Sequence, residues 1–191
     1  MSIAINYNDY KNGKIKEWMM EQASENLPKH FLFEIQNLIG ETKSLNIFPE
    51  FNIWFVPRLL TEDWKYVSRK RFLSDENFPN WCNSLGCGDR INFCHHKILS
   101  IHLDEIPENI GLLDVIISKK DLNHKYCFGE IVLDFMTSDK LIKTKYSYNL
   151  EWTNSSIIFL GTLARSDADE WKFFPMFHEY SGNIMLKGDI L

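Results

Sequence analysis

Two apolar runs separated by a short polar link, near the carboxyl end of the chain, constrain the fold most strongly. The runs cover 157–163 and 171–180, and residues 165–170 link them. Both runs are rich in the β-branched and aromatic residues that favour strands, and a polar link of this length is typical of a hairpin loop. Apolar residues occupy both faces of each run. The hairpin is therefore expected to lie deep inside a layered β structure.

The hairpin carries predictions about single residues. Pro175 has no backbone N–H to give to a neighbouring strand, so it predicts an edge strand or a bulge at this point. Strict alternation places Leu163 on the opposite face of its strand from Leu160. The residues at the centre of the hairpin are expected to be largely buried; they are Ile158, Leu160, Trp171 and Phe173.

Further short apolar segments precede the hairpin and repeat its strand pattern. In chain order the predicted strands cover 31–35, 51–60, 64–71, 97–103, 112–118, 126–136 and 143–150. Residues 77–90 are rich in Asn, Pro, Gly and Ser and are predicted to form a loop. In 97–103 the alternation points Leu99, Ile101 and Leu103 inward. About nine short strands indicate a mainly all-β chain, folded as a two-sheet antiparallel β-sandwich.

The amino-terminal region has a helical pattern instead. Ile15, Trp18, Met19 and Ala23 fall near helical spacing and Pro28 ends the run, so 14–26 is predicted to be one short amphipathic helix. Its Trp18 and Met19 are expected to pack on the sheet, with a patch for a partner as the alternative.

No linker or internal repeat divides the chain. Residues 1–191 are therefore predicted to form a single domain, with 1–28 as a helical extension and 29–191 as the sandwich. With 45% apolar and 14% aromatic residues, a chain of this length can bury a true core.

Composition also excludes several classes of function. The net charge of −5 carries no basic footprint for nucleic acid. No apolar run approaches the ~20 residues that span a bilayer, and the amino terminus shows no signal peptide. The four Cys are then expected to be reduced thiols, which predicts a cytoplasmic protein.

Several short motifs occur in an order that resembles a known family. They are Leu-Ser-Asp-x-x-Phe at 73–78, Phe-Gly-Glu-Ile at 128–131, Tyr-Asn-Leu at 148–150 and Glu-Trp-Lys-Phe at 170–173 in the closing hairpin. Their order and spacing over 73–184 resemble the TerD family of bacterial tellurite-resistance and stress-response proteins. The resemblance implies a β-sandwich that binds calcium without established catalysis. It favours a divergent, non-catalytic binding module that acts through protein partners.

The same resemblance suggests where calcium would bind. The family's ions lie in an acidic loop that begins with Gly-Asp, near an Asp-x-Asp strand; here Gly88-Asp89 matches the loop and Asn52 falls on the strand, while Asp75 is retained upstream. Calcium takes six to eight hard oxygen ligands. The residues after Asp89 begin with Arg90 and include imidazoles in place of carboxylates. Asn52, Asp75 and Asp89 are therefore interpreted as a degenerate calcium site, and weak or absent calcium binding is expected.

Two other chemistries stay open for residues 75–96. Cys82, Cys87, Cys94, His95 and His96 are ligand types that zinc takes, but their spacing matches no standard zinc motif. A Cys paired with a His can also serve a hydrolase as nucleophile. The chain contains no Gly-x-Ser-x-Gly, Walker loop or dinucleotide fingerprint. No enzyme and no cofactor are therefore predicted, with calcium binding, zinc binding and a Cys/His hydrolase as alternatives in that order.

Overall fold

Antiparallel pairing joins the ten strands of the described residues into two sheets. The computed structural model describes residues 25–38, 51–59, 73–74, 77–90, 94–119, 128–137, 141–153, 157–166 and 168–180. Their elements are β1 (His30–Leu38), β2 (Phe51–Leu59), β3 (Leu73–Ser74), β4 (Cys82–Arg90), β5 (Cys94–His102), the 3-10 turn η2 (Leu103–Glu105), β6 (Ile110–Lys119), β7 (Phe128–Met136), β8 (Leu141–Thr153), β9 (Ile157–Arg165) and β10 (Trp171–Tyr180).

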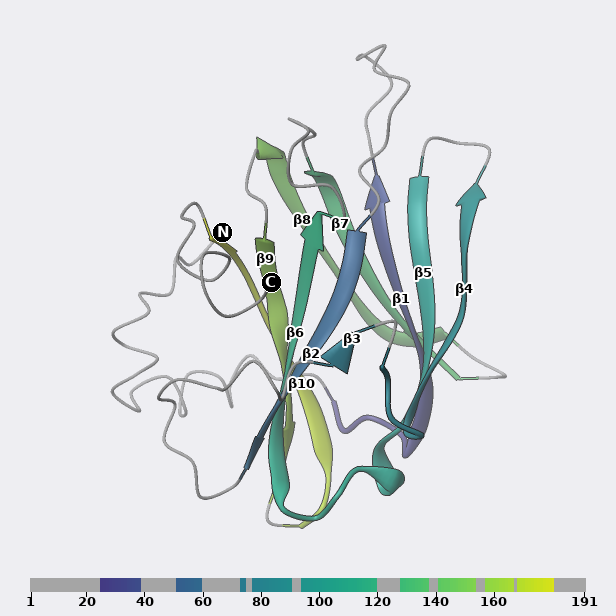
Figure 1. Cartoon of the computed structure of the whole chain (residues 1–191), viewed down its shortest axis with the longest axis vertical. Coiled ribbons are helices and arrows are strands. Elements are labelled where there is room, and N and C mark those ends of the chain that lie inside the picture. The colour runs from purple at the N-terminus through teal and green to yellow at the C-terminus, as the bar shows by residue number, and fades with distance from the viewer. Residues whose placement is uncertain are drawn as a thin grey trace.

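Each sheet contains five strands, and the two sheets pack face to face (Figure 1). The first sheet has the order β4-β5-β1-β7-β8, and the second sheet has the order β10-β9-β6-β2-β3. Every pairing between these strands is antiparallel. The predicted all-β, two-sheet antiparallel sandwich is confirmed. Of the predicted helix over 14–26 only residues 25 and 26 are described, and they are not helical, while residues 14–24 and the predicted strand over 64–71 lie outside the described residues.

Aromatic side chains join the two sheets at the centre of the core. Phe33 and Phe135 from the first sheet stack with ring centroids 4.7 Å apart, and Phe173 of the second sheet lies 5.1 Å from Phe135. All three are fully buried. Ring pairs at such distances stabilise a core beyond the area that they bury. Inward-facing aliphatic residues of both sheets surround them; they include Ile35, Ile53, Leu99, Ile101, Leu113, Val115, Ile117, Ile131, Leu133, Ile158, Leu160 and Leu163.

The closing hairpin lies where the sequence places it. Ile158, Leu160 and Phe173 are fully buried and Trp171 is 3% exposed, so their predicted burial is confirmed. Both features expected at Pro175 are present, because β10 is the edge strand of the second sheet and its register shifts between Pro175 and His178.

The predicted strict alternation of faces along β9 is wrong, and the alternation breaks at Gly161. Leu163 joins the same core cluster as Leu160, and the pairing of β6 with β9 shifts register beside Gly161. A Cβ atom on Gly161 would lie 2.6 Å from Cζ of Phe173 and would also collide with the carbonyl oxygen of Phe174. Glycine therefore allows the backbone of β9 to approach β10 closely enough for both leucines to face the core.

One predicted loop is a strand. Residues 77–90 contain β4, which pairs along β5 and forms an edge of the first sheet. Long-range pairing overrides the weak strand propensity of Asn, Gly and Ser, with an irregularity between Ser84 and Cys87. Strand β5 also begins at Cys94, earlier than predicted, because β4 and β1 pair with its first residues.

The start of β10 is tied to distant parts of the chain. The N–H of Leu27 donates to the carbonyl oxygen of Trp171 at 2.7 Å. The guanidinium of Arg165 lies 4.7 Å from the Trp171 ring, and it donates to the carbonyl oxygens of Ile106 at 2.9 Å and Pro107 at 3.3 Å. Trp171 thus contacts the segment before β1 and the end of β9, and Arg165 connects it to the loop before β6.

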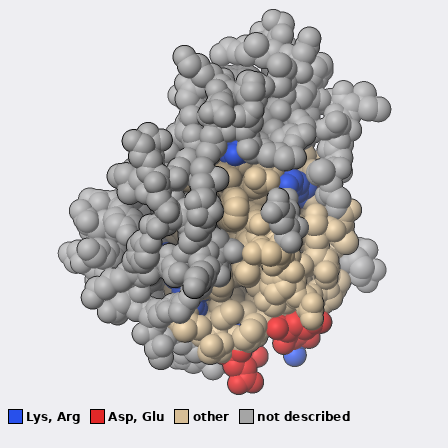
Figure 2. All heavy atoms as spheres, viewed as in Figure 1, with Lys and Arg blue, Asp and Glu red and all other residues tan. Residues whose placement is uncertain are grey.

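On the described part of the face drawn in Figure 2, acidic side chains gather at the lower end and a few basic side chains show among the uncharged ones. In the turn η2, Asp104 and Glu105 are both exposed. No helix in the described part of the chain is long and apolar enough to cross a membrane.

Removing the Trp171 ring tests this description of the core. Trp171→Ala is expected to lower the free energy of unfolding by about 3–5 kcal/mol, because a buried aromatic ring is replaced by a cavity. Lys172→Ala is the matched control, since Lys172 is the next residue and points to the opposite face of β10. Chemical denaturation measures both changes; an equal effect of the two substitutions would contradict the burial of Trp171.

Candidate functional site

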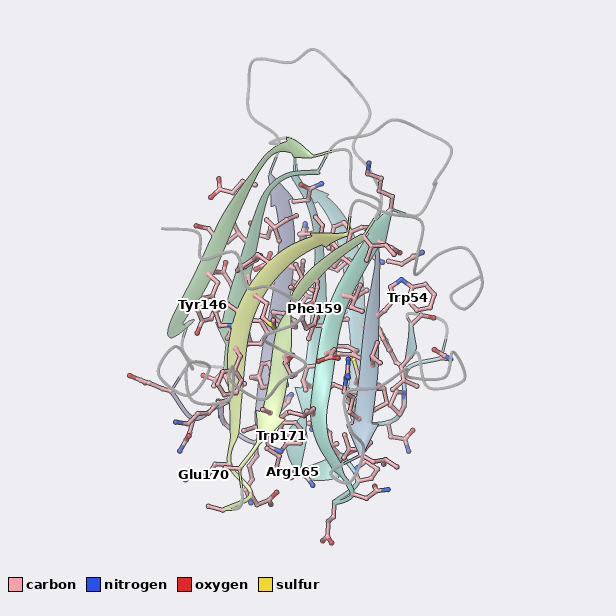
Figure 3. All side chains as sticks on the ribbon, turned by 90° about the vertical axis from the view of Figure 1, so that its left-hand side faces the viewer. Trp54, Tyr146, Phe159, Arg165, Glu170 and Trp171 are labelled. Carbon is pink, nitrogen blue, oxygen red and sulfur yellow. The ribbon has the colours of Figure 1, made fainter. Side chains whose placement is uncertain are left out.

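The second sheet has an outer face, directed away from the sandwich core, that is unusually apolar for a sheet surface (Figure 3). Antiparallel sheets commonly turn polar residues to this side. We define the outer face by the described residues that alternate with core residues on β2, β6, β9 and β10: Asn52, Trp54, Val56, Arg58, Leu112, Asp114, Ile116, Ser118, Ile157, Phe159, Thr162, Lys172, Phe174 and Met176.

Asp114 lies near the middle of the outer face. Its backbone pairs with Val56 on one side and with Thr162 on the other. One carboxylate oxygen accepts a hydrogen bond from Nε of Arg58 at 2.6 Å, and the other accepts from the Thr162 hydroxyl at 2.8 Å. The side chain of Asp114 is 3% exposed and that of Arg58 is 16% exposed. A buried charge pair is therefore held in fixed geometry on this face.

Burial raises the pKa of Asp114 above its ordinary value. The positive charge of Arg58 and the hydrogen bonds from Thr162 and Arg58 act in the opposite direction, but loss of solvation is the larger effect. Carboxyl groups whose pKa is raised by burial, beside a specific charge partner, are often found at functional sites.

An apolar cluster lies beside this charge pair. Val56, Ile116, Ile157 and Phe159 are each 6% exposed or less. Trp54 and Met176 pack against them and remain partly exposed. The Trp54 indole N–H donates to the Ser118 hydroxyl at 2.8 Å, which fixes the orientation of the ring. Partly exposed Trp and Met at the border of a buried cluster are typical of contact surfaces.

The outer face suits binding better than bond-breaking chemistry. Both oxygens of Asp114 already accept hydrogen bonds, so this carboxylate is oriented rather than available as a base. Its neighbour Val56 is aliphatic, and the hydroxyl of its neighbour Thr162 is already engaged in the hydrogen bond to it. The arrangement offers an apolar surface with one fixed pair of charges, which can orient a partner that covers it.

The structure describes the interpreted calcium site only in part. Asn52 is half-buried on β2 of the second sheet, where it pairs with Ser118. Asp89 lies on β4 of the first sheet, paired with His95, and its side chain is outside the described part of the structure, as is the whole of Asp75. Among the described residues, no group of three or more His, Cys, Asp or Glu side chains could hold a metal ion. Calcium binding at residues 75–96 stays a prediction.

The cysteines bear on the zinc and hydrolase alternatives. Cys82 is 2% exposed and belongs to the core cluster, so its thiol is closed to a substrate. The side chains of Cys87, Cys94 and Cys127 lie outside the described residues. His96 lies on the face of β5 opposite the core residue Leu99, and its Nδ1 atom is buried without a hydrogen-bond partner.

The first sheet carries a cluster of histidines that the sequence analysis did not predict. The rings of His30 and His102 stack with centroids 4.0 Å apart and planes inclined by 9°. The Ser100 hydroxyl lies 2.8 Å from Nε2 of His30 and 3.4 Å from Nε2 of His102. A metal bound by both rings would have to lie in both ring planes, which parallel stacking prevents. This cluster is therefore a hydrogen-bonded surface feature of the sheet.

One residue of the site can be recognised in the sequence. Asp114 lies inside the apolar run 112–118, and because Asp is seldom buried without a partner, this position indicates a buried carboxylate with a partner. The sequence does not indicate that Arg58 and Thr162 are its partners. They stand 56 and 48 residues away from it, and only the register of three strands joins them.

Two solved structures share this fold. The crystal structure of a protein of unknown function, SAV2460, matches with a TM-score of 0.61 and 10% sequence identity, over 85% of this chain and 95% of that one. The crystal structure of a homologue of the telluride resistance protein TerD from Streptomyces coelicolor A3(2) matches with a TM-score of 0.59 and 9% identity, over 83% of this chain and 94% of that one. No protein-family model and no curated protein matches the sequence. The chain has a TerD-like fold, and the resemblance of its motifs is confirmed at the level of fold.

The raised pKa of Asp114 predicts a pH dependence of stability. Because the folded state holds the Asp114 proton more tightly than the unfolded state does, this group makes the free energy of unfolding fall as pH rises from the ordinary carboxyl pKa through the raised one. Asp114→Asn is expected to remove that slope. Denaturation curves between about pH 4 and pH 8 measure it. Ser118→Ala, which removes a neutral group from the same face, is the control and should keep the slope; an unchanged slope in Asp114→Asn would contradict the assignment.

Calcium titration tests the degenerate site. Calorimetry is expected to show no binding tighter than about 1 mM, because the segment after Gly88 supplies one carboxylate and an adjacent Arg. Asp89→Ala should leave the titration unchanged. Micromolar binding that disappears in Asp89→Ala would overturn the prediction and establish a calcium site at residues 75–96.

Proposed function

We propose that this chain is a divergent TerD-like stress-response protein of the cytoplasm that acts as a non-catalytic binding module. Its contact surface for a protein partner is the outer face of the second sheet. The observation that carries the proposal is the apolar cluster of this face, bordered by partly exposed Trp54 and Met176 around the buried pair of Arg58 and Asp114.

The chemistry of the outer face supports a protein partner. Trp, Met and Arg are enriched at protein interfaces, and a rigid indole contributes contact area with little loss of conformational entropy. Trp54 is held by its hydrogen bond to Ser118, so part of its ordering precedes binding. The Arg58–Asp114 pair adds a directional element, which favours one orientation of the partner over others.

The likeness in fold supports the biological role that we propose. A structural neighbour is described as a homologue of a telluride resistance protein. The proposal extends to this chain a part in tellurium resistance, exerted by holding a partner and without chemical turnover. Cys82 in the core and the occupied oxygens of Asp114 support the non-catalytic form of the proposal within the described residues.

Substitutions on the outer face test the proposal in cells. In a host that lacks the chain, Trp54→Ala and Met176→Ala are expected to lower tellurite tolerance toward that of the empty host, because truncating an interface anchor removes about 2 kcal/mol of binding free energy. Leu32→Ala is the matched control: Leu32 is half-buried and alternates with core residues on the first sheet. Circular dichroism and thermal unfolding verify that all three variants fold.

Two outcomes would contradict this function. Full tolerance in both outer-face variants would exclude this face as the contact surface. Loss of tolerance in Cys87→Ser or Cys94→Ser, with the fold intact, would exclude a non-catalytic module and favour the Cys/His hydrolase.

A further inference from the structure

Two stacked histidines connect the start of β1 to the end of β5. His30 pairs with His102 in the register of the first sheet, and their rings are almost parallel, with centroids 4.0 Å apart. The Ser100 hydroxyl lies 2.8 Å from Nε2 of His30 and 3.4 Å from Nε2 of His102. Ser100 is buried, whereas His30 is exposed and His102 is half-buried. Protons from solvent therefore reach both rings, which share one buried hydrogen-bond partner.

The stack lies beside the hydrogen bonds that hold the segment before β1. The N–H of Leu103 donates to the carbonyl oxygen of Lys29 at 2.7 Å. The N–H of Leu27 donates to the carbonyl oxygen of Trp171, also at 2.7 Å. Trp171 begins the edge strand β10 of the second sheet, so this short segment runs from one sheet to the other. The stacked rings are the side-chain contact at the point where it enters the first sheet.

The two rings together accommodate one proton better than two. When one ring is charged, the Ser100 hydroxyl accepts a hydrogen bond from that ring and donates one to the neutral ring. When both rings are charged, each nitrogen is a donor, and the hydroxyl has no ring nitrogen to donate to. Two positive charges then face each other across the 4.0 Å stack. The second proton therefore opposes the stacked arrangement.

Glu105 of η2 offsets part of this repulsion. Its Oε1 atom lies 3.9 Å from Nδ1 of His102, and its side chain is 53% exposed. One carboxylate compensates one of the two positive charges, and the exposed Lys29, which precedes His30, adds a further positive charge. The described residues that lie next to the cluster in the sheet register are uncharged; they are Asn83 of β4, Leu32 of β1 and Met136 of β7.

We propose that His30 and His102 form an acid-sensitive latch, a contact that holds the start of β1 against β5 until both rings are protonated. Protonation of both separates the rings and breaks the hydrogen bonds of Lys29 and Leu27. Histidine changes its charge between about pH 8 and pH 5. Because the released segment binds two protons where the stack favours one, acid shifts the equilibrium toward release.

Release of the latch changes the edge of the second sheet. Leu27 occupies the free side of β10 beside Trp171, so its departure leaves backbone groups of an edge strand open. The latch thus couples acidity to the exposure of this edge. It is independent of the proposed function, whose contact surface is the outer face of the second sheet and whose test is tellurite tolerance.

Amide hydrogen exchange in the full chain tests the latch. The reporters are the N–H groups of Leu27 and Leu103, which both bond across the segment before β1. Each exchange rate is compared with the intrinsic rate of the same amide at the same pH, which removes the chemical effect of pH. We expect the protection of both amides to fall severalfold from about pH 7 to about pH 5. Leu133, in the middle of the first sheet, should keep its protection.

Contacts between the two rings provide a second measurement. Nuclear Overhauser contacts between ring protons of His30 and His102 are expected at about pH 7 and should disappear at about pH 5. Contacts that persist in acid would overturn the latch. Rings that separate while both reporter amides keep their protection would overturn it as well, because the side chains would then move without the backbone.

Substitutions identify the titrating groups. His30→Asn and His102→Asn each leave one titratable ring, so the protection of the reporter amides should be equal at the two pH values in either variant. His96→Asn is the matched control, since His96 lies on the same face of β5 as His102 and should keep the wild-type fall. Circular dichroism verifies that the variants fold. No fall in the wild type, or the same fall in His102→Asn, would overturn the latch.

Discussion

Burial of aromatic rings between the two sheets is the interaction on which the remaining structure depends. Phe33 and Phe135 approach from one sheet and Phe173 from the other, and burial of these apolar inward faces stabilises the packing of the two sheets. The contact requires β10 to lie close to β9, which the missing side chain of Gly161 permits. The fold therefore relies on one glycine in the second sheet as much as on the large residues around it.

The sequence was most informative where the signal is local. Alternating apolar residues in 157–180 predict the closing hairpin, its buried centre and the special place of Pro175. Strand β4 was not predicted, because its pairing with β5, rather than its composition, makes it a strand. The candidate site could be predicted least. Arg58, Asp114 and Thr162 lie far apart in the chain, and a pair of strands can be joined in several registers that only the whole core decides between.

The outer face combines two kinds of interaction with different consequences. Its apolar side chains favour any cover that excludes water, whereas the Arg58–Asp114 pair favours only a cover that leaves both charges hydrogen-bonded. Buried polar groups of this kind contribute little to stability but penalise wrong arrangements.

Strand β10 shows how an open sheet edge is closed to unwanted neighbours. Leu27 occupies one end of its free side. Further along, the row of backbone N–H and C=O groups is interrupted by Pro175, by the register shift that follows it and by the positive φ of 45° at Phe177. An intruding strand would find too short a run of backbone groups to pair with. The same irregularities that bend this strand therefore disfavour edge-to-edge pairing with another chain.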